Sequence, residues 1–180
     1  MWTPELPAAP HRHLCTDCGV SRTADPKRCA TACQFIHPDY PGLEQRVQGR
    51  QRIVEEDTPH PNDELFFGPH RRMLQAALTP SSQGAQWTGI TTRLAERLLE
   101  EGEVDAVITM TADPNDFWRP RPVIVTQASE MAQCRGMRMG YAPLLSLLEP
   151  AIRGGVKRLA VIGIPCQVYA LRALEKELGF

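Results

Sequence analysis

Residues 158–178 read RLAVIGIPCQVYALRALEKEL and place a short apolar strand directly before a helix. The first part, 158–164, is rich in β-branched and aliphatic side chains, and apolar residues then recur at helical spacing to the end of the stretch. The same alternation occurs earlier, because 88–101 has helical periodicity and 104–110 (VDAVITM) has the composition of a buried strand. Helices that alternate with buried strands predict an α/β fold.

Two further segments extend this pattern. Residues 122–126 (PVIVT) form another short apolar run, and 141–153 is predicted to be a helix that ends at Gly154-Gly155. We therefore expect a mostly parallel sheet with helices on both faces. Because open sheets of this class usually have about five or six strands, three strands predict a fragment of a larger protein.

The first part of the chain has a different texture. Residues 1–80 are rich in proline, histidine and arginine, and only a helical turn over 71–78 is predicted there. Such a segment cannot easily bury a core of its own, so we expect a metal site to hold it or the rest of the chain to support it. The predicted division is an irregular cysteine-rich segment, 1–80, followed by an α/β domain, 81–180.

Composition excludes several classes of protein. The chain has 180 residues, of which 42% are hydrophobic and 23% charged, as in ordinary globular proteins. It has no apolar run of the ~18 residues that a membrane span needs and no signal-peptide pattern, so we expect a soluble, cytoplasmic protein. The formal net charge of -1 gives no basic footprint for nucleic acid.

Four cysteines form a dense group near the front of the chain. Cys15, Cys18, Cys29 and Cys33 have the spacing C-x2-C-x10-C-x3-C, which indicates a metal centre in a reducing compartment. Four thiolates hold either a zinc ion or an iron–sulfur cluster, and unligated or disulfide-bonded cysteines are the third alternative. Nearby histidines could replace a ligand, although surface histidines are commoner: His11, His13 and His37.

The other two cysteines have different contexts. Cys166 follows the strand over 158–164 and opens the last helix, where the helix dipole and free amides favour a thiolate. It is therefore a candidate metal ligand or redox cysteine at the carboxyl end of the sheet, with a small buried side chain as the alternative. Cys134 lacks such a context and is expected to be structural.

The segment before the first strong helix combines small and hydroxyl residues, reading SSQGAQWTGITT over 81–92. Such a turn lets backbone amides at a helix start approach a pyrophosphate. A capped helix with no ligand is the alternative, because no G-x-G-x-x-G or P-loop pattern is present. The candidate cofactor-binding residues are Gly84, Gln86, Trp87, Thr88, Gly89, Thr91 and Thr92.

Several of these motifs resemble those of one known family. Residues 84–90 (GAQWTGI), 104–107 (VDAV) and 164–172 (IPCQVYALR) look like the family of the beta subunits of coenzyme F420 hydrogenases and dehydrogenases. The front segment, 14–19 (LCTDCG) and 32–36 (ACQFI), is most similar to one branch of it. That branch contains the ferredoxin-dependent divinyl chlorophyllide 8-vinyl reductase and 7-hydroxymethyl chlorophyll a reductase.

The resemblance implies an iron–sulfur flavoprotein oxidoreductase. Electrons would pass from ferredoxin through a 4Fe-4S cluster on the cysteines to FAD at the 84–92 turn, and from there to a chlorophyll-type tetrapyrrole, at its 8-vinyl or 7-hydroxymethyl group. An alternative within the family is a coenzyme F420-dependent hydrogenase or dehydrogenase beta subunit, or an electron-relay subunit. An alternative outside it is a non-catalytic zinc-ribbon interaction module.

The chain departs from the chlorophyll branch in two places. Members of the branch carry a third cysteine two residues after the second, where this chain reads Cys18-Gly19-Val20-Ser21. Cys29 is therefore expected to serve as the fourth ligand. A segment of the Lys-Pro-Thr-Leu-Ser-Pro type is replaced by RMGYAP over 138–143. The resemblance thus implies the cofactors more directly than the substrate.

Overall fold

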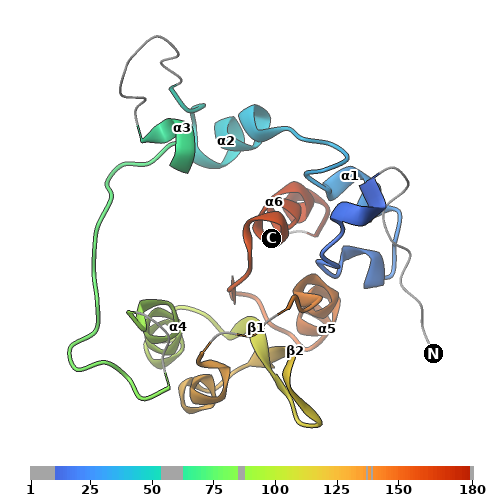
Figure 1. The fold of residues 1–180 in the computed structure, drawn as a ribbon. Helices are drawn as coiled ribbons and strands as arrows, with labels where there is room; N and C mark the ends of the chain where they lie inside the picture. The colour runs from blue at the N-terminus through green and yellow to red at the C-terminus, as the bar shows by residue number, and fades with distance from the viewer. Residues whose placement is uncertain (1–10, 54–62, 85–87, 137, 139, 179–180) are drawn as a thin grey trace.

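The computed structural model describes residues 11–53, 63–84, 88–136, 138 and 140–178. In chain order its helices and strands are η1 (His11–Leu14), η2 (Val20–Arg22), α1 (Arg28–Ala32), α2 (Tyr40–Gln48), α3 (Glu64–Phe67), α4 (Ile90–Glu100), β1 (Ala106–Asp113), β2 (Asp116–Val125), η3 (Ala128–Cys134), η4 (Leu144–Leu147), α5 (Leu148–Arg153), β3 (Leu159–Val161) and α6 (Pro165–Leu178). Helices and a small sheet alternate after residue 88, which confirms the α/β class (Figure 1).

The three strands form a mixed sheet in the order β2-β1-β3. Strands β1 and β3 are parallel, as expected, whereas β1 and β2 pair antiparallel. The reason is the short turn between them, in which the Asp113 carboxylate accepts a hydrogen bond from the Asn115 amide at 2.9 Å. So short a connection can only reverse the chain into a hairpin. The expectation of a mostly parallel sheet was therefore wrong for this pair.

Strand β1 lies at the centre of the core. Its residues Ala106, Val107 and Ile108 are all fully buried, so both faces of the strand are covered. Because successive side chains point to opposite faces, Ile108 packs with η4, α5 and α6, whereas Val107 packs with α4 and η3. In Figure 1, α4 lies on one side of the sheet and α5 and α6 on the other.

The strands expected after residue 88 are all present, although β2 begins at 116 instead of 122. The helix expected over 141–153 is a 3-10 turn, η4, followed by α5, and η3 was not predicted. The helical turn expected over 71–78 was wrong, because no helix is formed in this described stretch. Leu74 is 75% exposed there and has no core to cover. A helix that the pattern did not predict is α2, which the Asp39 carboxylate caps by accepting from the Gly42 amide at 2.9 Å.

The front segment packs against the last helix. Helices α1 and α2 both contact α6. The Tyr169 hydroxyl of α6 donates to the His37 carbonyl at 2.8 Å and accepts from the Asp39 amide at 2.7 Å. The Tyr40 and Tyr169 rings lie 5.1 Å apart. Residues more than a hundred positions apart in the sequence are thereby brought side by side.

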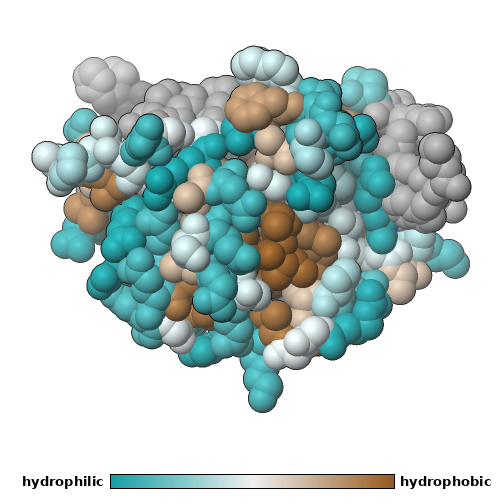
Figure 2. All heavy atoms as spheres, turned by 90° about the horizontal axis from the view of Figure 1, so that it is seen from below, coloured by the Kyte–Doolittle hydropathy of each residue, from teal (hydrophilic) through white to brown (hydrophobic). Residues whose placement is uncertain are grey.

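No helix within the described ranges is long and apolar enough to cross a membrane. Figure 2 shows one face of the molecule, seen from below. Hydrophilic side chains cover most of it, and hydrophobic side chains gather in a hollow near its centre. The apolar surface on this face is therefore concentrated in a depression rather than spread as a belt.

Candidate functional site

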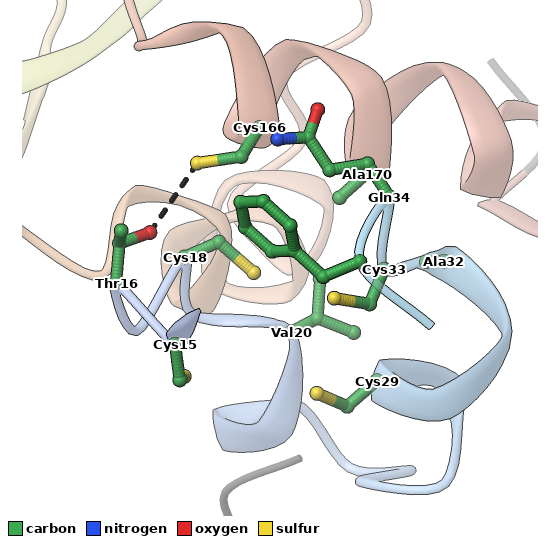
Figure 3. Close-up of a pocket in the computed structure, with 11 residues that line it drawn as sticks. Cys15, Thr16, Cys18, Val20, Cys29, Ala32, Cys33, Gln34, Cys166 and Ala170 are labelled. Carbon is green, nitrogen blue, oxygen red and sulfur yellow. Dashed lines mark hydrogen bonds between the residues drawn. The ribbon is translucent and has the colours of Figure 1, made fainter. Parts of the chain in front are cut away.

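The structure brings five of the predicted cysteines to one pocket. Four come from the front segment and one, Cys166, from the first turn of α6 (Figure 3). We call this the thiol pocket; it is lined by Cys15, Thr16, Cys18, Val20, Cys29, Ala32, Cys33, Gln34, Phe35, Cys166 and Ala170. All five cysteines proposed as metal ligands from the sequence therefore line one pocket, whereas the possible replacement ligands His13 and His37 do not line it.

The turn that carries the first two cysteines is held against the core. Asp17 adopts a left-handed conformation with φ 49°, and its carboxylate pairs with the Arg22 guanidinium. The Cys18 carbonyl accepts from the Leu145 amide at 3.0 Å. A Cβ added at Gly19 would lie 2.5 Å from the backbone nitrogen of Ser146, so this position has no room for a side chain.

The second pair of cysteines belongs to helix α1 and its end. Cys29 lies in the first turn of α1, and Cys33 follows its last residue. The Cys33 carbonyl accepts from the His37 amide at 2.8 Å, which fixes the turn after the helix. Glu149 of α5 accepts from the Ala24 amide at 3.0 Å and pairs with Arg28, so this part of the pocket is anchored to the core as well.

Burial and mutual repulsion affect the thiols. Burial raises the pKa of Cys18 to about 12, with smaller contributions from the neighbouring thiols of Cys29, Cys166 and Cys15. Burial likewise raises the pKa of Cys29 to about 11, with contributions from Cys33 and Cys15. These thiols are close enough to repel one another as thiolates. They would ionise together only around a cation, which is the electrostatics of a metal site.

The thiol pocket can be compared with the ligand sets of a zinc ion and of an iron–sulfur cluster. All six cysteines are free, so the disulfide alternative was wrong. In the part of the chain that the structure describes, no three His, Cys, Asp or Glu side chains come close enough to hold a metal ion between them. A tetrahedral zinc needs four ligands within about 2.0–2.3 Å of one ion. An iron–sulfur cluster likewise takes four thiolates, so the five thiols around the pocket supply donors for either group.

The predicted flavin segment lines a separate cavity at the start of α4. Gly89, with φ 70°, precedes the helix in a left-handed conformation. The cavity, of about 280 Å³, is called here the threonine cavity and is lined by Thr88, Gly89, Ile90, Thr91, Thr92, Thr109, Met110, Met131, Cys134, Gly136 and Ile162. Since pockets for drug-sized ligands measure about 300–1,000 Å³, it has room for part of a dinucleotide.

Not all of the predicted flavin residues line this cavity. Gln86 and Trp87 lie outside the described residues. Gly84 does not line it, although its carbonyl lies 3.6 Å from where a Cβ of Gly136 would be. Cys134 does line it, which sequence reasoning missed, because an isolated cysteine in a loop carries no motif.

A buried ion pair holds the loop that precedes α4. Arg135 donates to the Glu96 carboxylate at 2.8 Å and to the Gln83 carbonyl at 3.3 Å. Glu96 is only 8% exposed, and Arg93 also donates to it, at 3.1 Å. Arg135 follows the last residue of η3, so only the fold shows that it joins η3 to the middle of α4 and to Gln83 in the preceding loop.

The first turn of α6 contributes residues to two cavities. Its Gln167 side chain accepts from the Ile164 amide at 3.0 Å and donates to the Ala142 carbonyl at 2.7 Å. A further cavity, the rim cavity, shares Met110 and Ile162 with the threonine cavity; it is lined by Met110, Gly140, Tyr141, Ala142, Leu144, Ile162, Gly163, Ile164 and Gln167. Adjacent residues of α6 therefore line the thiol pocket (Cys166) and the rim cavity (Gln167).

Comparison with known proteins adds a second line of evidence. Residues 73–149 match the family model described as coenzyme F420 hydrogenase/dehydrogenase, beta subunit N-term. An uncharacterized protein of Nostoc sp. (strain PCC 7120) is 38% identical over 94% of this chain and 42% of its own length.

Two relatives with assigned activities are also similar. The chloroplastic 7-hydroxymethyl chlorophyll a reductase of Oryza sativa subsp. japonica is 36% identical over 94% of this chain and 36% of its own length. A component of the F(420)H(2) dehydrogenase of Methanosarcina mazei is 29% identical over 66% of this chain and 31% of its own length. The chain thus spans less than half the length of each curated relative described here.

Proposed function

This chain belongs to the family of coenzyme F420 hydrogenase/dehydrogenase beta subunits, and from that premise we propose that it is part of an iron–sulfur flavoprotein oxidoreductase. The observation that carries the proposal is the convergence of five thiols on one pocket, next to the helix turn that adjoins the rim cavity. Cys15, Cys18, Cys29 and Cys33 would hold a 4Fe-4S cluster. Cys166 supplies a fifth thiol in the wall of the same pocket.

When bound, the cluster and FAD would supply one-electron transfer and its conversion to two-electron reduction of a substrate. The chain's own residues bind and orient these groups. The hydroxyls and helix-start amides of Thr88, Thr91 and Thr92 suit a flavin pyrophosphate. The buried Val20 and Ala32 in the wall of the thiol pocket exclude water from the sulfurs.

The proposed electron donor is ferredoxin, and the proposed acceptor is a chlorophyll-type tetrapyrrole reduced at an 8-vinyl or 7-hydroxymethyl group. The similarity to the rice 7-hydroxymethyl chlorophyll a reductase, which extends over 94% of this chain, supports the 7-hydroxymethyl group as the site of reduction. Ferredoxin and the 8-vinyl group rest on the resemblance of the sequence motifs alone. That relative is named as chloroplastic, and the cytoplasmic location expected from the sequence stays a prediction for this chain.

A second candidate is a coenzyme F420-dependent or electron-relay subunit, which the similarity to the archaeal dehydrogenase favours. That similarity is lower, at 29%, and covers only 66% of this chain. The zinc-ribbon alternative has the least support, because the relatives with assigned activities are named as a reductase and a dehydrogenase.

A spectrum of the anaerobically purified protein tests the proposal. We expect a broad visible absorption that dithionite bleaches, together with flavin that heating releases. A colourless protein that contains stoichiometric zinc and no flavin would exclude an iron–sulfur flavoprotein. If the cofactors are present, turnover with reduced ferredoxin or with reduced F420 separates the two candidates.

A further inference from the structure

Thr16 contacts the one pocket cysteine that comes from the other end of the chain. Its Oγ1 lies 3.3 Å from the Sγ of Cys166, 150 positions later in the sequence (Figure 3). Both residues are partly buried, and both line the thiol pocket. The front segment and α6 are therefore joined at this pocket by a hydrogen bond to sulfur.

The chemistry of the pair decides the direction of this hydrogen bond. A protonated thiol and a hydroxyl can each donate to the other. A thiolate, whether bare or bound to a metal, has no proton, so the Thr16 hydroxyl is then the donor. Hydrogen bonds to sulfur are one of the ways in which proteins set the reduction potential of iron–sulfur clusters.

The hydroxyl is held in place by the turn around it. Thr16 lies between Cys15, whose sulfur accepts from the Asp17 amide at 3.3 Å, and Asp17 itself, whose carboxylate pairs with Arg22. The Cys166 side is fixed by Gln167, which braces the start of α6 through two hydrogen bonds. Two rigid segments therefore present the oxygen and the sulfur to each other.

Among the thiols of the pocket, Cys166 is the one whose neighbour in the sequence lines the rim cavity. Its neighbour Gln167 lines that cavity, and Met110 and Ile162 separate the rim cavity from the threonine cavity.

We propose that Thr16 is a positioning residue that sets the reduction potential of the group in the thiol pocket by donating a hydrogen bond to the sulfur of Cys166. The inference rests on the proposed function, since it requires a redox-active cluster in this pocket. Reduction adds negative charge to the cluster, which the electron-rich sulfur of Cys166 in the wall of the same pocket repels. A hydrogen bond donated by the Thr16 hydroxyl draws electron density from that sulfur and so weakens the repulsion. Loss of the hydroxyl must therefore make the cluster harder to reduce.

Potentiometric titration of the purified holoprotein, followed by electron paramagnetic resonance, tests this. Thr16→Val replaces the hydroxyl with a methyl group of similar size and should shift the cluster midpoint to a more negative potential at unchanged iron content. Thr16→Ser keeps the hydroxyl and should restore the parent midpoint. Thr31→Val is the matched control, because its hydroxyl lies on α1 and donates to the Arg28 carbonyl instead of a sulfur; its midpoint should equal the parent's.

The outcomes separate the inference from its premise. A parent protein without iron overturns the proposed function, whatever the variants do. A parent cluster whose midpoint is the same in Thr16→Val overturns the inference and leaves the proposed function standing. An equal shift in Thr16→Ser and Thr16→Val also overturns it, because the hydroxyl would then not be the cause. If Thr16→Val loses iron, Thr16→Ala supplies the midpoint in its place.

Discussion

At the scale of single residues, the chain assigns different tasks to cysteines that look alike in the sequence. Cys29 and Cys134 are both partly buried and free. Cys29 lines the thiol pocket, whereas Cys134 lines the threonine cavity at the other side of the sheet. The comparison of these two residues therefore separates a proposed cluster ligand from a cysteine that lines the threonine cavity.

Removal of the Cys29 thiol tests the ligand set. We expect Cys29→Ala to lose most of its iron, because the third cysteine of the chlorophyll branch is missing and Cys29 is proposed to replace it as a ligand. Cys134→Ala should keep the iron content of the parent. The measurement is iron per chain after anaerobic purification. Parent-level iron in Cys29→Ala would mean that Cys166 or another group is the fourth ligand.

At the scale of secondary structure, the starts of β1 and β3 are joined by one carboxylate. Asp105 accepts from the Arg158 side chain at 2.7 Å and from the amides of Arg158 and Lys157 at 2.8 and 3.0 Å. The Arg158 hydrogen bond is the main reason that the pKa of Asp105 falls to about 2. The family-like VDAV motif at 104–107 therefore has a structural role in aligning two parallel strands.

This carboxylate predicts a pH dependence of stability. Because the pKa of Asp105 is lower in the folded protein, its contribution is present above the ordinary value of 3.8 and is lost as the pH falls toward 2. Asp105→Asn should reduce the free energy of unfolding at neutral pH, and its difference from the parent should shrink on acidification. Denaturant unfolding at several pH values measures this. The control is Glu103→Gln, because Glu103 is exposed and its carboxylate has no hydrogen bond among the described side chains; its effect on stability should not change with pH. A difference between Asp105→Asn and the parent that stays the same at every pH would contradict this explanation.

The start of α6 depends on a glycine. A Cβ at Gly163 would lie 2.8 Å from the Gln167 Oε1 and 3.1 Å from its Cβ. Gly163→Ala should therefore displace Gln167 and destabilise the protein by about 1–3 kcal/mol. Gly154→Ala is a milder control, since its Cβ would lie 3.3 Å from two helix carbonyls. Thermal unfolding of both variants checks this, and equal melting temperatures would show that Gln167 adjusts without cost.

Elements with strong hydrophobic periodicity could be predicted from the sequence, and others could not. Helices α4 and α6 follow directly from apolar spacing, because each packs one face on the sheet. Helix α2 was missed because no buried residue marks it, and its Asp39 cap and Gly49 end were the available signals. The turn over 71–78 has apolar residues that no neighbour covers, so local composition predicted structure that the fold does not support.

At the scale of the whole molecule, the candidate site was only partly visible in the sequence. The spacing of Cys15, Cys18, Cys29 and Cys33 predicted a common site, since they lie close along the chain. That Cys166 joins them depends on how α1 and α2 pack against α6, which no local pattern encodes. Long-range packing also produces the contact of Thr16 with Cys166. It likewise places Met110 and Ile162 in the walls of both the threonine cavity and the rim cavity.

Metal analysis of the anaerobically purified protein decides whether the thiol pocket holds the proposed iron–sulfur cluster. Iron, zinc and acid-labile sulfide would be measured on the same sample. The account predicts about four irons and four sulfides per chain, with no stoichiometric zinc. One zinc per chain without sulfide would contradict it.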